Sequence, residues 1–208
     1  MLDYLRDPDE ITRRSIAAIR AEADLSGLPP ALGALAARLI HACGMTDLAQ
    51  DLAWGGDPAG AGRQALAAGA PVLSDAAMVA AGVSRARLPA ANEVLCPLGD
   101  ARVPELARRA GTTRSAAAVE LWLPHLGGAV VAIGNAPTAL YRLLEVLEAG
   151  APRPAVVLAF PVGFVGAAES KEALIAAKVG IPYLTLRGRR GGSALAAAAV
   201  NALSGEDR

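Results

Sequence analysis

The 208-residue sequence contains few aromatic residues and no excess of charge of either sign. Phe, Trp and Tyr together make up 3% of the chain, and 20 basic residues balance 20 acidic ones. Proteins that bind single-stranded nucleic acid stack bases on aromatic side chains, and a net positive charge attracts DNA or an anionic membrane. We therefore expect neither nucleic-acid binding nor membrane binding.

Cysteine is also scarce, and long apolar runs are absent. Cys43 and Cys96 are too few for a disulfide framework and lack the CxxC spacing that suits zinc. The most apolar stretch, AVVLAFPVGFVGAA, is interrupted by Pro161, Gly163 and Gly166 and is shorter than the roughly 18 residues of a membrane span. The start, MLDYLRDPDE, has no signal-peptide pattern. These features predict a cytoplasmic protein.

The common catalytic signatures are missing too. The sequence contains no GxSxG, HExxH, GxGxxG or GxxxxGK[ST] motif, and its two histidines, His41 and His125, are far apart in the sequence. No metal site or nucleotide site is therefore expected from motifs, and motifs alone do not define a reaction.

Two helices are well signalled near the start of the chain. Asp7 suits an N-cap and Pro8 suits the first helical position. Ser15 is the polar member of this helix's apolar face, where its hydroxyl can either bond to the preceding turn or contact a ligand. The second helix is predicted over PPALGALAARLIHACG, with Gly44 as its stop.

From about residue 70 short apolar runs alternate with helical segments. The runs PVLSD, EVLCPL, GAVVAIGN, AVVLAFPVG and PYLTLRG are typical of buried strands, and helices are expected near 74–82, 101–123, 137–149, 168–179 and 191–203. Continuous apolar strands that alternate with helices predict an α/β fold with a mostly parallel sheet flanked by helices on both faces. We expect a single domain over residues 1–208, with N-terminal helices over about 1–45 and an α/β core over about 70–203.

His41 is the candidate proton-transfer group. It lies in the last turn of the second predicted helix, three residues after Arg38, so both side chains project from one face. A packed structural histidine is the alternative interpretation. An imidazole can both donate and accept a proton near neutral pH, which makes a catalytic role possible at this position.

Several charged or polar residues fall in loops beyond the carboxyl ends of the expected strands, where α/β proteins bind ligands. Arg189 lies in the turn GRRGGS, Lys171 in AAESKEAL and Asn135 in IGNAPTAL, while Arg114 begins a helix in TTRSAAAVELW. An arginine is unfavourable at a helix N-terminus unless an anion is near. Solvated side chains and simple helix capping are the alternative interpretations.

Seven sequence blocks, in order, resemble the precorrin-8X methylmutase family of cobalamin biosynthesis. They are RRSIAAIRAEADL, RLIHACGM, VLSDAAMVAAGV, TRSAAA, IGNAPTAL, PVGFVGAAESK and GRRGGSALAAAAVNAL, and the similarity extends from about residue 8 to 203. The resemblance implies a homodimeric isomerase that moves a methyl group from C-11 to C-12 of precorrin-8X and forms hydrogenobyrinate without a cofactor or a metal. The active site is then expected near the subunit interface.

The resemblance also implies roles for individual residues. The family's catalytic histidine falls on His41, and substrate-contacting positions fall on Ser15 and Arg38. Arg114, Asn135, Lys171 and Arg189 are further expected substrate contacts, on the grounds of motif position and charge.

Three alternatives remain open at this point. The substrate can be the cobalt-containing precursor of the anaerobic route, with the same fold and the same histidine. The chain can instead be a corrinoid carrier that binds without turnover, or a generic nucleotide-phosphate-binding α/β domain. Turnover distinguishes the enzyme from the carrier, and the incomplete phosphate motifs disfavour the nucleotide-binding domain.

Overall fold

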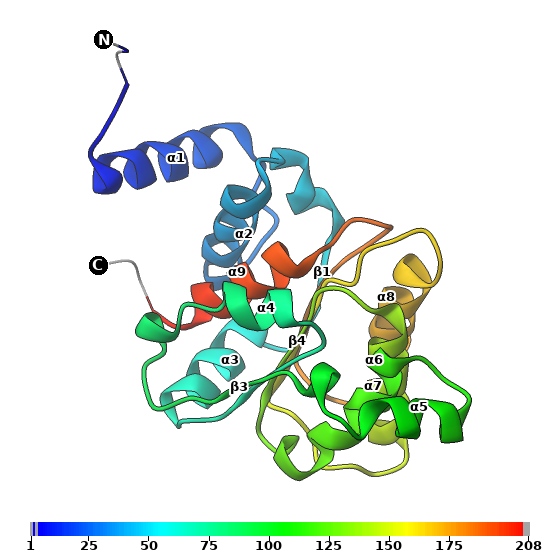
Figure 1. Ribbon diagram of the computed structural model, residues 1–208. Helices are drawn as coiled ribbons and strands as arrows, with labels where there is room; N and C mark the ends of the chain where they lie inside the picture. Colours follow the sequence, from blue (N-terminus) through cyan, green and yellow to red (C-terminus); the bar gives the residue numbers. More distant parts are fainter. Residues whose placement is uncertain (1, 3, 206–208) are drawn as a thin grey trace.

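The computed structural model describes residue 2 and residues 4–205. Its centre is a six-stranded sheet in the order β1-β6-β5-β4-β2-β3 (Figure 1). The strands are β1 (Leu52–Gly55), β2 (Val72–Ser74), β3 (Val94–Leu95), β4 (Val130–Ile133), β5 (Val156–Ala159) and β6 (Tyr183–Leu186). Strands β2 to β6 pair in parallel, and β1 pairs antiparallel with β6. The prediction of a mostly parallel sheet is confirmed.

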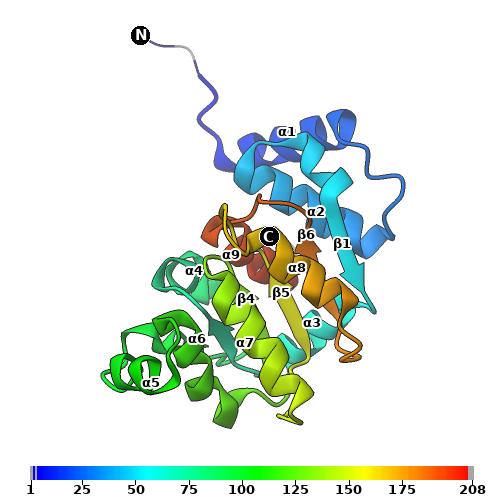
Figure 2. The same cartoon turned by 90° about the vertical axis from the view of Figure 1, so that its right-hand side faces the viewer.

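Helices cover both faces of this sheet, as expected. They are α1 (Pro8–Glu22), α2 (Pro30–Cys43), α3 (Pro58–Ala67), α4 (Ala77–Gly82), α5 (Val103–Ala110), α6 (Arg114–Ala118), α7 (Pro137–Glu148), α8 (Ala167–Ala176) and α9 (Ser193–Leu203). Short 3-10 helices occur at η1 (Thr46–Asp51), η2 (Arg85–Arg87), η3 (Pro97–Gly99) and η4 (Val119–His125). Figure 2 shows α7 and α8 lying in front of the strands, with α1 and α2 at one end of the molecule.

Alternate residues of each strand point to opposite faces, so the sheet separates two apolar clusters. In β5, Val156 and Leu158 belong to the cluster beneath α2, α3 and α9, whereas Val157 and Ala159 belong to the cluster beneath α7. Because all four side chains are buried, the strand appears in the sequence as one continuous apolar run.

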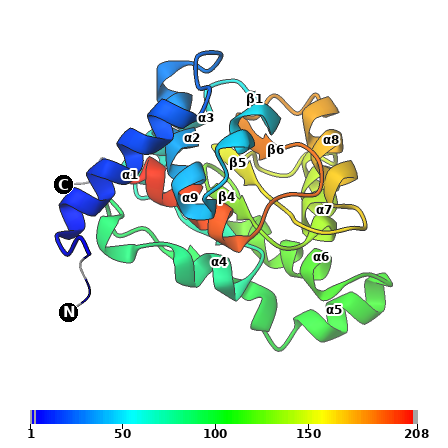
Figure 3. The same ribbon diagram turned by 90° about the horizontal axis from the view of Figure 1, so that it is seen from above.

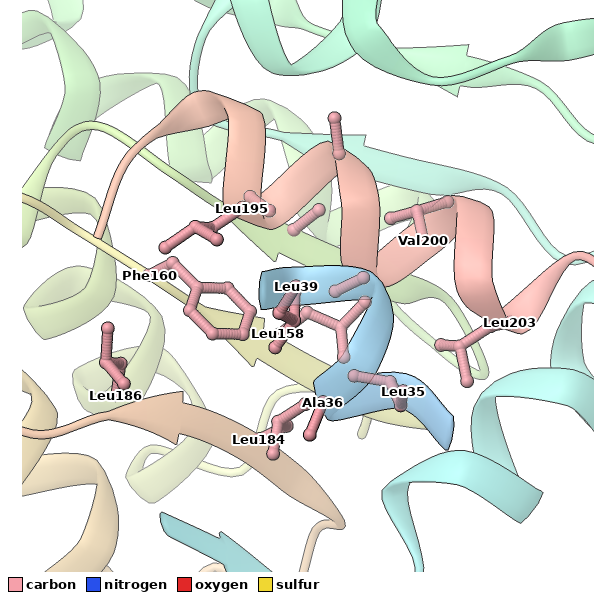
Figure 4. Close-up of a cluster of buried hydrophobic side chains, with 14 of the residues drawn as sticks. Leu35, Ala36, Leu39, Leu158, Phe160, Leu184, Leu186, Leu195, Val200 and Leu203 are labelled. Atoms are coloured by element: carbon pink, nitrogen blue, oxygen red, sulfur yellow. The ribbon is translucent and has the colours of Figure 1, made fainter. Parts of the chain in front are cut away.

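Helix α2 is held by the first of these clusters, which fixes the position of His41 at its end. In Figure 4, Leu35 and Leu39 of α2 lie among Leu158, Phe160 and Leu195. Leu39 and Ile40 are almost completely buried. Helix α1 packs on the outside of α2, and Ile19 is its buried residue.

Two elements precede the expected start of the α/β core near residue 70. Strand β1 joins the sheet from residue 52, and α3 packs against α2 and α9. The segment predicted as helical over 101–123 is divided into α5, α6 and η4. The sheet therefore begins earlier in the chain than the sequence pattern indicated.

Candidate functional site

Asp75 joins two of the loops that follow the parallel strands. It comes directly after β2, and its carboxylate accepts hydrogen bonds from the backbone N–H groups of Gly134, Asn135 and Ala136, at 2.8, 2.9 and 2.6 Å. Burial raises the pKa of the Asp75 carboxyl, although the three N–H donors act in the opposite direction. Asp75 therefore fixes the turn that leads from β4 into α7.

The expected contacts Asn135 and Arg114 lie at this edge of the sheet. Asn135 is exposed, and the N-cap position of α7 belongs to Ala136, so helix capping does not account for the asparagine. The hydroxyl of Thr113 lies 2.7 Å from that of Thr138, which connects the start of α6 to the first turn of α7. Arg114 donates one bond to the carbonyl of Leu98, and its side chain is exposed.

The loops after β5 and β6 are bound to each other. Gly192 N–H donates to the carbonyl of Phe160 at 2.8 Å, and Gly163 N–H donates to that of Arg189 at 3.3 Å. A Cβ atom at Gly191 would lie 2.3 Å from the carbonyl oxygen of Phe160, so only glycine fits this close approach. The loop that carries the arginine turn is therefore held against the end of β5.

The three arginines of that turn have different surroundings. Arg187 forms an ion pair with Glu172, and Arg190 pairs with Asp47 and Asp51 of η1. The exposed Arg189 guanidinium instead lies over the Phe164 ring, 5.3 Å from its centroid. Arg189 is thus the arginine of the three that faces solvent without a carboxylate contact in the described part of the chain.

Lys171 lies beneath this surface. Its side chain is completely buried, and Nζ donates to the carbonyl of Arg190 at 2.6 Å. Burial lowers the pKa of Lys171 to about 8. The ammonium is therefore committed to the protein backbone, a placement that the sequence did not indicate.

His41 lies at the exposed end of α2. Gly44, with φ of 71°, ends the helix, and its N–H donates to the carbonyl of Ile40 at 2.7 Å. The buried residues Leu39 and Ile40 face the core, whereas the His41 side chain is exposed. His41 is therefore not a core histidine in this chain, and the imidazole is accessible to a ligand.

Arg38 lies on α2, and Ser15 lies on α1, the helix that packs against α2. Arg38 is half-buried, and both burial and the positive charge of Arg87 lower its pKa. The Ser15 hydroxyl donates to the carbonyl of Ile11 at 2.8 Å, which is the back-bonded arrangement considered for this position. Its oxygen retains a lone pair that can accept a further bond.

A cavity of about 540 Å³ lies beside Arg38, between α1, α2, α3 and α9. Figure 3 shows α1, α2 and α9 next to one another in this region. Arg20, Arg38 and Arg63 line the cavity. Guanidinium groups arranged in this way suit a ligand with several carboxylates.

Sequence reasoning missed two of these arginines. Arg20 belongs to the block RRSIAAIRAEADL, so the resemblance to the family could have pointed to it. Arg63 lies on α3, a helix that the hydrophobic pattern did not reveal. Arg63 could only be found from the packing of α3 beside α2.

Two further observations concern the described residues as a whole. None of their helices is long and apolar enough to cross a membrane. No group of three or more His, Cys, Asp or Glu side chains within residues 4–205 is arranged to hold a metal ion.

Comparisons with known proteins agree on one family. The family model described as precorrin-8X methylmutase matches residues 10–205. A precorrin-8X methylmutase of Pseudomonas aeruginosa is 63% identical to this chain over 206 residues, and the alignment covers 99% of each protein. A cobalt-precorrin-8 methylmutase of Priestia megaterium is 38% identical over 168 residues, covering 80% of this chain and 74% of the relative.

The fold comparison gives the same result. The crystal structure of a precorrin-8X methylmutase from Thermus thermophilus superposes with a TM-score of 0.86 and 39% identity, over 94% of each chain. A methylmutase moves a methyl group within one molecule, so the enzyme is an isomerase of the intramolecular-transferase class. The chain belongs to the precorrin-8X methylmutase family.

Proposed function

We propose that this cytoplasmic enzyme converts metal-free precorrin-8X to hydrogenobyrinate, with His41 as proton donor and acceptor. The observation that carries this proposal is the combination of an exposed imidazole at the end of α2 with an arginine-lined cavity one helical turn away. The first group supplies acid–base chemistry, and the second recognises the carboxylate arms of a corrinoid.

The proposed reaction balances without an external oxidant or methyl donor. The protonated His41 imidazole gives a proton to a ring nitrogen, which selects the tautomer along whose conjugated path the methyl group migrates. The bond from the methyl carbon to C-11 breaks as the bond to C-12 forms, and the electrons stay within the substrate. The imidazole then recovers its proton.

The substrate is larger than the cavity, so the cavity holds only one edge of it. We propose that Arg20, Arg38 and Arg63 bind carboxylate arms there, and that the Ser15 hydroxyl on α1 contacts the substrate. Arg114, Asn135 and Arg189 are then available to the arms that extend over the carboxyl edge of the sheet.

A homodimer would close the open side of this site. Three large apolar side chains beyond the carboxyl ends of the strands are exposed to solvent: Met78 (70%) in α4, and Phe164 (83%) and Val165 (89%) in the loop after β5. Such exposure is unusual in a monomer, and it suits a surface that the macrocycle and a partner subunit cover together.

The arginine cavity gives a prediction about affinity. We expect Arg63→Ala to raise KM about 10-fold or more, because a hydrogen bond to a charged group contributes about 1.5–3 kcal/mol, while kcat changes little. Steady-state rates measured by absorbance give both values. Arg109→Ala is the matched control, since Arg109 is an exposed arginine on α5, away from α1 and α2 (Figure 1). Equal KM values for the two variants would refute the cavity's role.

Metal-free precorrin-8X and cobalt-precorrin-8 need to be compared directly as substrates. We expect kcat/KM to be at least about 10-fold higher for the metal-free compound, since the Pseudomonas precorrin-8X methylmutase is 63% identical to this chain and the Priestia cobalt-precorrin-8 methylmutase 38%. A preference for the cobalt compound would support the anaerobic route. Binding of both compounds without conversion of either would support a corrinoid carrier.

A further inference from the structure

Lys171 is a charged group that the proposed reaction does not use, and its burial needs a reason. The side chain is completely buried in the first half of α8. Removing an ammonium from water costs several kcal/mol unless partners compensate for the loss. The closest partner is the carbonyl of Arg190, which accepts a bond from Nζ at 2.6 Å. Asp51 and Glu172 add favourable negative charge.

Arg190 connects Lys171 to the segment that follows His41. The backbone carbonyl of Arg190 is held by Lys171, while its guanidinium bonds to Asp47, at 2.8 Å, and to Asp51. Both carboxylates belong to η1, which begins two residues after the glycine that ends α2. One residue thus joins α8, the loop between β6 and α9, and η1.

Arg189, one residue earlier, is held by the same loop. Its carbonyl accepts a bond from Gly163 N–H, and its guanidinium lies over the Phe164 ring. If the peptide at Arg190 were released, the exposed Arg189 side chain would lose the backbone that aims it at the carboxyl edge of the sheet.

We infer that Lys171 is a positioning residue: it fixes the loop over 187–192 and thereby aims Arg189 at a substrate carboxylate, without touching the substrate itself. This replaces the expectation that Lys171 binds substrate directly, because the buried ammonium has no surface to offer a ligand. The role given to Arg189 rests on the proposed function. The anchoring of the loop by Lys171 does not depend on that function.

A double-mutant cycle tests the inference. Lys171→Met removes the hydrogen-bond donor and keeps the length of the side chain nearly constant. We expect KM to rise about 10-fold, which corresponds to the loss of one charge-assisted hydrogen bond, and kcat to stay within about threefold of the wild-type value. Arg189→Ala should raise KM in the wild-type background but add little in the Lys171→Met background. A direct substrate contact by Lys171 would instead make the two effects multiply.

Hydrogen exchange of the free protein gives a readout that does not depend on activity. In Lys171→Met we expect faster amide exchange over 187–192 and at Gly163, with unchanged exchange in α7. Lys171→Gln, which keeps a neutral donor, should restore most of the protection and of the wild-type KM. If Lys171→Met does not fold, Lys171→Gln takes its place in both experiments, with smaller effects of the same kind expected.

The chain's other lysine, the exposed Lys178, provides the control variant Lys178→Met. Unchanged loop exchange in Lys171→Met, or multiplying effects in the cycle, would overturn the inference. Failure of the wild-type protein to convert precorrin-8X would overturn the proposed function instead, and the exchange result would still decide whether Lys171 anchors the loop.

Discussion

His41→Ala is expected to lower kcat by about 100- to 10,000-fold, the range that one positioned acid–base group contributes. The side chain is exposed at the end of α2, so its removal leaves no cavity in the core. The free energy of unfolding should therefore stay within about 0.5 kcal/mol of the wild-type value. Absorbance assays give kcat, and urea titration gives the stability.

His125→Ala is the matched control, because His125 is the only other histidine and is also exposed, at the end of η4. Its activity should equal that of the wild type. Near-normal turnover by His41→Ala would show that another group transfers the proton, whatever the family of the protein.

Asp75→Ala is expected to destabilise the fold by about 3 kcal/mol or more. The substitution leaves three backbone N–H donors, at Gly134, Asn135 and Ala136, without their acceptor. Each buried donor that loses its partner costs about 1–3 kcal/mol. Because these donors form the turn from β4 into α7, activity should fall as well, through the displacement of Asn135.

Asp75→Asn keeps the volume of the side chain, so it distinguishes the effect of lost hydrogen bonds from the effect of lost volume. The asparagine oxygen can still accept the bonds of Asn135 and Ala136, which share Oδ2 in the native protein, while the bond from Gly134 is lost. We expect a loss of about 1–2 kcal/mol, clearly smaller than for alanine. Equal stabilities of Asp75→Ala, Asp75→Asn and the wild type in urea unfolding would contradict this role.

The strands that the sequence predicted are those buried on both faces. The segments GAVVAIGN and AVVLAFPVG contain β4 and β5, and all four residues of each strand are buried. Strand β1 has the sequence LAWG and is only partly buried at the edge of the sheet. Such a short edge strand has no pattern that distinguishes it from a loop.

Helix α3 escaped prediction for a different reason. Its sequence, PAGAGRQALA, contains two glycines, which are poor helix formers. Gly62 lets α3 approach α9 closely, since a Cβ atom there would lie 2.5 Å from a methyl carbon of Leu203. Tertiary contact between α3 and α9 therefore outweighs the local preference of the segment.

The sequence indicates which residues are candidates for the site, but their exposure and grouping depend on the assembled fold. The sequence pattern puts His41 in the last turn of α2 but leaves open whether the imidazole is packed or accessible, and the structure exposes it. The burial of Lys171 depends on how α8 packs beneath the loop over 187–192, and the grouping of Arg63 with Arg38 depends on α3. Both are properties of the assembled fold.

We propose that the methyl group moves within the substrate, with His41 as the acid and base. The most direct measurement follows metal-free precorrin-8X, labelled with carbon-13 in its C-11 methyl group, by nuclear magnetic resonance during incubation with the wild-type enzyme and with His41→Ala. We predict that the wild type transfers the whole label to the methyl group at C-12, and that the variant leaves it at C-11. Bound substrate that keeps its label at C-11 with the wild type, or equal transfer by both proteins, would contradict the account.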